Sequence, residues 1–202
     1  MPTLLIVIGS TRPVRAGVPI ARWFEDVARN HGAFGVEVAD LKTLDLPLLD
    51  ESQHPRLAQY EHAHTKAWSQ TVSRADAVVF ILPEYNYSMT APVKNAIDYL
   101  YAEWNYKPLG LVSYGGISGG LRAAQMVKQA VTTVKMMPIP EGVSVHYAAK
   151  HIKDGVFQPD DSTEPLARAM LDELARWEDA LRPLRGAQQS VEPLSPKHPE
   201  YA

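Results

Sequence analysis

The sequence predicts a single α/β domain built around a parallel β-sheet, and three observations support this fold class. Apolar segments of strand length alternate with segments of helical periodicity, which is the pattern of repeated β-α-β units. The first apolar segment, residues 4–8, contains no polar residue, as expected for a strand covered by helices on both faces. The length of 202 residues, with 46% hydrophobic and 21% charged residues, suits one globular domain with a substantial core.

The first half of the chain contains the first two expected strands. Residues 4–8 form one of them, and a helix should follow over residues 18–31, with Pro19 in its first turn. Residues 36–39 form the second strand, after a turn that contains glycine. Proline and acidic residues interrupt residues 44–55, which we therefore expect to be a surface loop.

The second half repeats the alternation of strands and helices. Apolar side chains at three- and four-residue steps predict a long amphipathic helix over residues 57–75, which leads into a strand at residues 77–82. Another helix should begin after Thr90, a favourable N-cap, with Pro92 in its first turn. The remaining expected elements are a strand at residues 109–112, a helix at 121–134, a strand at 143–145 and a helix at 166–181.

The end of the chain differs in composition from the rest. From Pro183 onward, proline, glutamine, serine and glutamate dominate, and too few apolar residues remain to form a core. We therefore expect the folded domain to comprise residues 1–182. The tail, residues 183–202, should be disordered or packed against a partner subunit.

Composition also argues against several classes of function. No apolar segment approaches the roughly 18 residues of a membrane span, and no signal peptide is recognisable, so we expect a cytoplasmic protein without membrane contact. A formal net charge of −3 argues against nucleic acid as a partner. The absence of cysteine excludes disulfides, thiolate nucleophiles and cysteine-held iron–sulfur clusters. Electron transfer would then require a bound organic cofactor or a metal without thiolate ligands.

Polar loops follow three of the expected strands at their carboxyl ends, where ligands bind in open parallel sheets. In the first loop, residues 9–15, Ser10 and Thr11 precede a helix N-terminus, whose backbone N–H groups and dipole favour an anion. Arg12 and Arg15 add charge-assisted donors. We interpret this loop as a phosphate site; the alternative is an ordinary turn with two solvated arginines.

The second loop, residues 83–88, contains two tyrosines and an asparagine where a short turn would suffice. Tyr85 and Tyr87 offer flat apolar faces, and their backbone together with Asn86 offers donors and acceptors to a planar heterocycle. The alternative is a rigid loop whose tyrosines cap the sheet.

The third loop, residues 113–120, repeats glycine in pairs. Glycines allow close approach of the backbone to a ligand, and their N–H groups could contact the electron-rich edge of a reduced ring. The same segment fits the G-x-S-x-G pattern of serine hydrolases, with Ser118 as nucleophile and His146 or His151 as a later base. Only Glu141 lies between them as an acid, and the paired glycines separate the serine from the strand, which argues against this alternative.

The three loops resemble, in kind, order and spacing, the flavin-contacting loops of the NADPH-dependent FMN reductase family. The resemblance extends from residue 4 to about residue 145, and the segment P-E-Y-N is its most specific part. It implies a flavodoxin-like three-layer fold, in which a five-stranded parallel sheet in the order 2-1-3-4-5 has helices on both faces. It also implies FMN as the cofactor and NADPH or NADH as the electron donor.

The activity that this resemblance implies is a ping-pong cycle. An NAD(P)H oxidoreductase of this kind passes hydride from NADPH to bound FMN and then to a small acceptor: free flavin, a quinone, an azo compound or a metal oxyanion. Members are typically homodimers with the flavin near the subunit contact, so we expect a homodimer or homotetramer. A flavodoxin-like electron carrier is an alternative, although such carriers are strongly negative and use a hydroxyl-rich phosphate loop.

The flavin-site residues that the resemblance implies come from the same loops. The first loop would hold the phosphate, the second would line the isoalloxazine ring, and the third would contact its far side or pyrimidine edge. No catalytic acid or base and no metal site are expected; His62 and His64, two apart on an expected helix, should point in different directions. The expected set is Ser10, Thr11, Arg12, Arg15, Gly17, Val18, Pro83, Glu84, Tyr85, Asn86, Tyr87, Ser113, Tyr114, Gly115 and Gly116.

Overall fold

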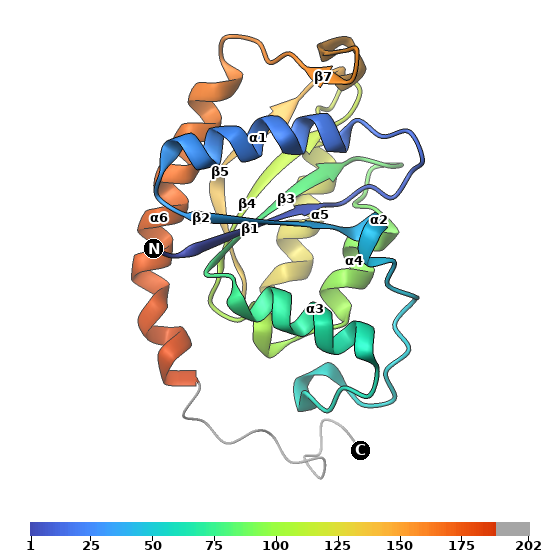
Figure 1. Cartoon of the computed structure of the whole chain (residues 1–202), viewed down its shortest axis with the longest axis vertical. Helices are drawn as coiled ribbons and strands as arrows, with labels where there is room; N and C mark the ends of the chain where they lie inside the picture. The colour runs from blue at the N-terminus through green and yellow to red at the C-terminus, as the bar shows by residue number, and fades with distance from the viewer. Residues whose placement is uncertain (189–202) are drawn as a thin grey trace.

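The computed structural model describes residues 1–188 and contains the predicted parallel sheet. Its five strands pair in the order β2-β1-β3-β4-β5, and every neighbouring pair is parallel (Figure 1). This order confirms the flavodoxin-like topology that the family resemblance implies. The strands are β1 (Thr3–Ile8), β2 (Gly35–Asp40), β3 (Ala77–Pro83), β4 (Pro108–Tyr114) and β5 (Met137–Val145).

Helices cover both faces of the sheet (Figure 1). One face carries α1 (Gly17–His31) and α6 (Thr163–Gln188), and the other carries α3 (Ala63–Arg74), α4 (Ala91–Asp98) and α5 (Leu121–Thr132). No helix in the part of the chain that the structure describes combines the length and the apolar character needed to span a bilayer. The short elements are α2 (Leu41–Leu44), the 3-10 turns η1 (Pro55–Leu57), η2 (Ala102–Trp104) and η3 (Ala148–His151), and the hairpin of β6 (Ile152–Lys153) and β7 (Val156–Phe157).

The central strands are held in place by burial on both faces. Every residue of β3 and β4 is buried, as expected for parallel strands between two helical layers. Along β1, successive side chains enter opposite cores: Leu5 belongs to the cluster that contains Trp68, whereas Ile6 belongs to the cluster that contains Phe24. A slip of one residue would exchange these faces, so the register of the strands, and with it the position of the loops that follow them, is strongly specified.

Helix α3 is shorter than the sequence predicts. The helix expected over residues 57–75 begins only at Ala63. Ala58 adopts a left-handed conformation with φ of 50°, which ends the preceding 3-10 turn. The Glu51 carboxylate then accepts a hydrogen bond from the backbone N–H of His62 at 3.1 Å, and His62 is the extended N-cap residue of α3. Contacts from a distant loop therefore set the start of this helix, and helical periodicity alone does not reveal them.

Strand β5 is longer than predicted because it lies at the edge of the sheet. The sequence predicts a strand only at residues 143–145, after two prolines, yet β5 begins at Met137. Pro138 pairs with Leu109 of β4, and an irregularity in the register follows it. Proline is tolerated in an edge strand because its missing N–H need not serve a second neighbour.

Helix α6 continues through Pro183 to Gln188, beyond the domain boundary expected at residue 182. Arg185, in this extension, forms an ion pair with Glu178 and donates to the carbonyl oxygen of Tyr106 at 3.0 Å. These contacts fix the end of the helix to the sheet. The expectation about the tail concerns residues 189–202 and lies outside the described residues.

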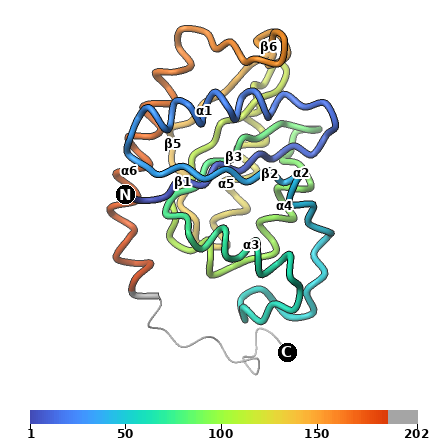
Figure 2. Tube along the Cα trace, in the orientation of Figure 1, coloured from blue at the N-terminus to red at the C-terminus, as the bar shows by residue number. Residues whose placement is uncertain are grey.

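The loops of interest and the end of α6 lie at opposite edges of the sheet. In the chain trace of Figure 2, the dark-blue loop after β1 extends beyond the sheet at one side, whereas α6 descends away from it. Arg185 near the end of α6 contacts Asp76, the residue before β3, which identifies this as the amino-terminal edge of the strands. The loops after β1, β3 and β4 meet at the carboxyl-terminal edge.

Candidate functional site

The three predicted loops converge on one cavity of about 200 Å³ at the carboxyl edge of the sheet. Eight of the expected site residues line it, together with four that the sequence did not indicate. Ala148 and Ala149, two of these four, lie in the 3-10 turn after β5, and alanine carries no chemical signal that could have identified them. The expected residues in its wall are Ser10, Arg12, Arg15, Pro83, Glu84, Tyr85, Tyr114 and Gly115, and the remaining lining residues are Val14 and Ala16.

The other expected site residues lie near the cavity without lining it. Gly17 and Val18 begin α1, Asn86 and Tyr87 form the tip of the second loop, and Thr11 lines a different hollow. Ser113 and Gly116 flank the part of the third loop that does line the cavity.

In the first loop, Arg15 is already paired within the protein. Its guanidinium donates two hydrogen bonds to the Asp40 carboxylate, at 2.6 and 2.5 Å, and one to the carbonyl oxygen of Ser10 at 2.5 Å. Only 10% of the side chain is exposed. Arg15 therefore holds the loop after β1 against the end of β2, and its charge is largely compensated by Asp40. The sequence predicted it as a phosphate donor, and its partner is a carboxylate of this chain.

Arg12 differs from Arg15 in each of these respects. Its side chain is exposed, and no ion pair or hydrogen bond of it is present within residues 1–188. The helix that follows is also open at its start, because the N-cap residue Ala16 provides no side-chain acceptor for the first N–H groups of α1. An uncompensated cation beside an uncapped helix N-terminus is a favourable environment for an anion.

Two tyrosine hydroxyls lie close to this anion-favouring point. Tyr85 Oη and Ser10 Oγ form a hydrogen bond of 3.2 Å that links the second loop to the first. Tyr114, at the end of β4, is 6% exposed, and its hydroxyl has no hydrogen-bond partner in the described chain. Burial raises the pKa of Tyr114, so the phenol remains protonated and is able to donate.

The second loop is fixed by a residue that the sequence did not indicate, Arg122 in the first turn of α5. Its backbone N–H and its Nη1 donate to the two oxygens of Glu84, at 3.0 and 2.9 Å, so that Glu84 caps this helix. Burial raises the pKa of Glu84, but hydrogen bonds from Ser118 and Arg122 outweigh it, and the pKa is lowered overall. The Arg122 guanidinium also lies 4.0 Å from the centre of the Tyr87 ring, a cation–π contact.

The tip of the second loop is a tight turn with an unusual backbone. Tyr85 and Ser88 exchange two backbone hydrogen bonds of 3.0 Å. The residues between them, Asn86 and Tyr87, have φ of 50° and 70°, in the left-handed region that bulky residues rarely adopt. The turn leaves Tyr87 exposed, and the contact with Arg122 helps to retain it there.

The third loop is a close turn that requires glycine at its end. Gly120 has φ of 83°, and a Cβ there would lie 2.6 Å from the Tyr114 nitrogen. The Ser113 hydroxyl donates to the carbonyl oxygen of Gly119 at 2.9 Å and so serves the loop itself. Gly115 N–H is also occupied, by the carbonyl oxygen of Val145 at 3.2 Å. Gly116 N–H has no partner within the described residues, and a Cβ added there would meet only open space.

The arrangement expected for a serine hydrolase does not form. The Ser118 hydroxyl lies against the Glu84 carboxylate, on the side of the second loop. His146 is held elsewhere, with Nδ1 at 2.9 Å from the carbonyl oxygen of Ile117 and Nε2 at 3.5 Å from Ser144 Oγ. A nucleophile and its base must lie within hydrogen-bond reach of one another, and these two side chains have other partners.

A larger hollow of about 490 Å³ lies on the other side of the first loop, between α2 and α4. Thr11 lines it, together with Lys42, Asp45 and mainly aliphatic residues. Its single cation and single anion give it no preference for a phosphate. The smaller cavity therefore has the better chemistry for a phosphorylated ligand, despite its size.

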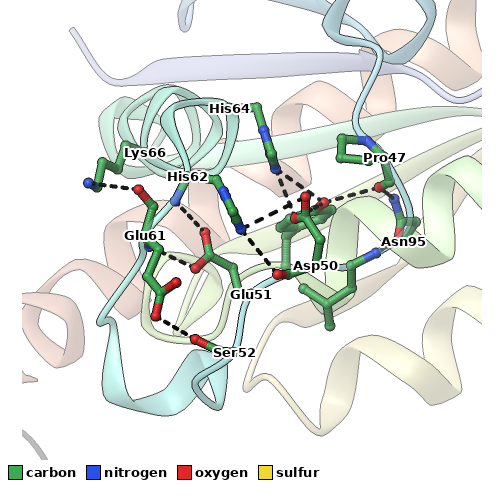
Figure 3. A network of polar contacts seen from close by, with 11 residues as sticks. Pro47, Asp50, Glu51, Ser52, Glu61, His62, His64, Lys66 and Asn95 are labelled. Atoms are coloured by element: carbon green, nitrogen blue, oxygen red, sulfur yellow. Dashed lines mark hydrogen bonds and ion pairs between the residues drawn. The ribbon is translucent and has the colours of Figure 1, made fainter.

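The loop that contributes Leu46 and Leu48 to this hollow belongs to the network in Figure 3, in which the Pro47 carbonyl oxygen accepts from Asn95. Asp50 accepts a hydrogen bond from Tyr99 Oη and contacts His64 Nε2, both at 2.9 Å, and the contact with His64 lowers the pKa of Asp50. The rings of His62 and His64 stack, with centroids 5.1 Å apart and planes inclined by 8°. The expectation that they diverge was wrong, because His62 is the extended N-cap of α3 and not part of the helix.

Comparison with known proteins agrees with these observations. The chain matches the NADPH-dependent FMN reductase family over residues 2–150. It is 38% identical over 160 residues to an NAD(P)H-dependent FMN reductase of Schizosaccharomyces pombe, covering 78% of this chain and 80% of the relative. It is 30% identical over 183 residues to a quinone reductase of Pseudomonas putida, covering 87% and 94%.

A solved structure shows the same fold. FerB, a flavoenzyme NAD(P)H:(acceptor) oxidoreductase from Paracoccus denitrificans, aligns with a TM-score of 0.69 at 23% identity, covering 90% of this chain and 99% of that chain. The strand order, the three loops at one edge and the matched family all indicate the same kind of protein. The chain therefore belongs to the NADPH-dependent FMN reductase family and is a flavin-dependent NAD(P)H oxidoreductase.

Proposed function

We propose that this enzyme holds the FMN phosphate in the cavity between its three loops and uses the flavin to reduce a small acceptor, a quinone or an azo compound. The observation that carries the proposal is a pair of unsatisfied donors at this point: within the described residues, Arg12 has no counter-ion and the first N–H groups of α1 have no side-chain cap. Each of them would be satisfied by one phosphate group.

The size of the cavity indicates that it would enclose only the phosphate end of the flavin and leave the ring outside. A volume of about 200 Å³ is below the roughly 300–1,000 Å³ of sites that enclose a whole drug-sized ligand. It suits the phosphate and the adjoining chain. The ring would then lie at the rim, over the exposed Tyr85 and against the third loop, with one face open to the donor and the acceptor.

The residues of this chain position the flavin and need not exchange protons with it. When bound, the flavin supplies the capacity to take hydride from a nicotinamide and to pass electrons on. Gly116 N–H is the free donor of the third loop and would face the ring edge. Glu84, fixed by Arg122, keeps the second and third loops at a constant separation, which preorganises the ring site.

The choice of acceptor is supported by the names of the relatives. They include the quinone reductase of Pseudomonas putida and an NADPH azoreductase of a Bacillus species, 28% identical over 176 residues. An open rim accepts flat substrates of different outline, because stacking requires only a planar face. Free flavins and metal oxyanions remain further candidates to be compared in the same assay.

We also propose a cytoplasmic homodimer or homotetramer in which a second copy packs beside the rim and leaves the open face of the ring accessible. Large apolar side chains are exposed around it: Tyr87, Ile117, Leu121 and Tyr147. Two contacts bring together the segments that carry them, since Arg122 stacks on Tyr87 and Tyr147 N–H donates to the Gly116 carbonyl oxygen. Contiguous apolar surface of this kind is typical of subunit contacts.

Anaerobic reduction of the flavin-loaded protein tests the function. The protein is reconstituted with FMN, freed of excess ligand and mixed with NADPH or NADH without oxygen. We expect the flavin absorption to bleach and then to recover when a benzoquinone is added. An electron carrier of the flavodoxin kind would stay oxidised until a partner reductase was supplied, and that outcome would contradict the proposal.

A further inference from the structure

We infer that the Tyr114 hydroxyl is a direct ligand of the flavin phosphate, an inference that rests on the proposed function. Tyr114 ends β4, which is separated in the sheet by β3 from β1, the strand that leads into the phosphate loop. The expected role of its segment is contact with the ring. The position of Oη instead assigns it to the phosphate end.

The side chain of Tyr114 reaches across the sheet edge to the start of α1. A Cβ added at Gly17, the first residue of this helix, would lie 2.7 Å from Tyr114 Oη. The absence of a side chain at Gly17 is therefore what admits the hydroxyl to the helix N-terminus. The positive charges of Arg12 and Arg15 also act on the phenol at this point.

Among the described residues, no group completes a hydrogen bond with this hydroxyl. The neighbouring Ser10 acts to lower the pKa of Tyr114, but its Oγ has hydrogen-bond geometry with Tyr85 Oη, at 3.2 Å, and not with Tyr114 Oη. Tyr114 Oη is left without a partner although the residue is more than nine-tenths buried. A buried hydroxyl without a partner destabilises a protein, and phenylalanine would fill the same space without that penalty. A phosphate oxygen beside Arg12 and the α1 N-terminus would satisfy it.

The test compares Tyr114→Phe with Tyr99→Phe, a control in which the lost hydroxyl is already paired. Tyr99 is fully buried, and its single O–H is shared between Asp50 Oδ1 at 2.9 Å and the Pro47 carbonyl oxygen at 3.1 Å, away from the cavity. We expect Tyr114→Phe without flavin to unfold at the same temperature as the wild type or higher. Tyr99→Phe should unfold at a lower temperature, because its partners lose their donor.

Flavin affinity supplies the second readout, measured by fluorescence quenching with FMN and with riboflavin. Loss of a hydrogen bond to a charged group predicts an FMN dissociation constant raised about tenfold to a hundredfold in Tyr114→Phe. The riboflavin constant should be unchanged, and Tyr99→Phe should leave both constants unchanged. This pattern would establish a contact that only the phosphate provides.

Other outcomes overturn the inference and can be told apart from failure of the proposed function. Equal weakening of FMN and riboflavin would place the hydroxyl against the ring or the ribityl chain. A lower unfolding temperature of Tyr114→Phe without flavin would mean that the hydroxyl has a partner within the protein. A wild-type protein that binds neither flavin would contradict the proposed function itself.

Discussion

The two edges of the sheet differ in whether their polar groups have partners within the protein. At the carboxyl edge, and counting only partners within residues 1–188, Arg12 lacks a counter-ion, the start of α1 lacks a cap and the Tyr114 hydroxyl lacks a partner. At the amino edge, the buried charges are paired with one another or bonded to the backbone. A donor without an acceptor destabilises the folded chain. We therefore expect a group of such donors at a place where a bound ligand supplies the acceptors. By this comparison, the carboxyl edge is the one suited to bind a ligand, and the amino edge is the one that stabilises the fold.

The amino edge is centred on Glu178 of α6, whose side chain is 1% exposed. Arg182 and Arg185 both donate to its carboxylate. Arg185 also contacts Asp76, which in turn accepts the backbone N–H of Thr3 at 2.8 Å. The network thus links the last helix to the starts of β1 and β3. It closes the core at the end where no ligand is expected.

The largest expected effect is a loss of stability in Glu178→Ala, which removes the centre of this network. The change leaves Arg185 partly buried without its main counter-ion, and removal of one member of a buried pair costs about 3–5 kcal/mol. Urea denaturation should show a loss of that order, whereas flavin affinity of the folded protein should stay unchanged. Glu173→Ala, which removes only the partner of the exposed Arg176, should cost less than about 1 kcal/mol. Equal losses in the two variants would contradict the comparison.

The amino edge should also show a pH dependence due to Lys107. This lysine is 4% exposed, and its Nζ donates to the Val72 carbonyl oxygen at 2.5 Å. Burial, assisted by the charge of Arg185, lowers its pKa to about 7. An unfolded chain keeps this proton up to about pH 10, so between these values the unfolded state binds more protons and the stability of the folded protein rises with pH.

Replacing this lysine isolates its contribution. The free energy of unfolding of the wild type, minus that of Lys107→Met, should increase from pH 7 to pH 10 by about 3–4 kcal/mol and level off above about pH 11. Below pH 7 the difference should be constant. Guanidinium titrations of both proteins across this range provide the measurement. A difference that does not change with pH would mean that Lys107 keeps its proton when folded.

At the carboxyl edge, Arg12→Ala and Arg15→Ala should have different effects, because Arg12 would bind the phosphate whereas Arg15 holds the loop in place. Arg12→Ala should raise the FMN dissociation constant about tenfold or more through loss of a charge-assisted contact, with riboflavin binding and stability unchanged. Arg15→Ala leaves Asp40 and the Ser10 carbonyl without their donor, so stability should fall and both flavins should bind more weakly. If Arg15→Ala instead affects FMN alone, the assignment of these two arginines is reversed.

The smallest expected effect concerns the ring side of the cavity. Arg122→Ala removes the side-chain contacts with Glu84 and Tyr87 but leaves the backbone N–H that Glu84 caps. The Arg122 side chain is 41% exposed, and contacts of a cation that solvent reaches in this way contribute about 0.5–1 kcal/mol, so FMN and riboflavin should both weaken about threefold. The equal effect on the two ligands is the informative feature. A selective loss of FMN would place Arg122 at the phosphate.

The sequence predicted the fold and the location of the site because both follow from local patterns. Buried strands, helical periodicity and the loops that follow strands can all be recognised in short segments. The pairing of Arg15 with Asp40 was missed because it joins residues 25 apart that become neighbours only when β2 lies beside β1. Arg122 was missed for a similar reason, since it lies 38 residues from Glu84.

The roles within the site depend on which donors the folded chain has already used. Sequence alone cannot distinguish Gly115, whose N–H is bonded to Val145, from Gly116, whose N–H has no partner in the described part of the chain. The same holds for Tyr114 and Tyr99, two buried tyrosines of which only one has a paired hydroxyl. The structure distinguishes the two residues of each pair because it shows which N–H and O–H groups already have hydrogen-bond partners. The proposed roles follow from the groups that do not.

Comparison of FMN with riboflavin on the wild-type apoprotein tests the central claim most directly, because the two ligands differ only in the phosphate. Phosphate bound between Arg12, the α1 N-terminus and Tyr114 predicts that FMN binds at least about a hundredfold more tightly, as several charge-assisted hydrogen bonds require. The advantage should shrink as salt is added, because Arg12 is exposed. Equal affinities for the two flavins would show that the phosphate lies outside this cavity.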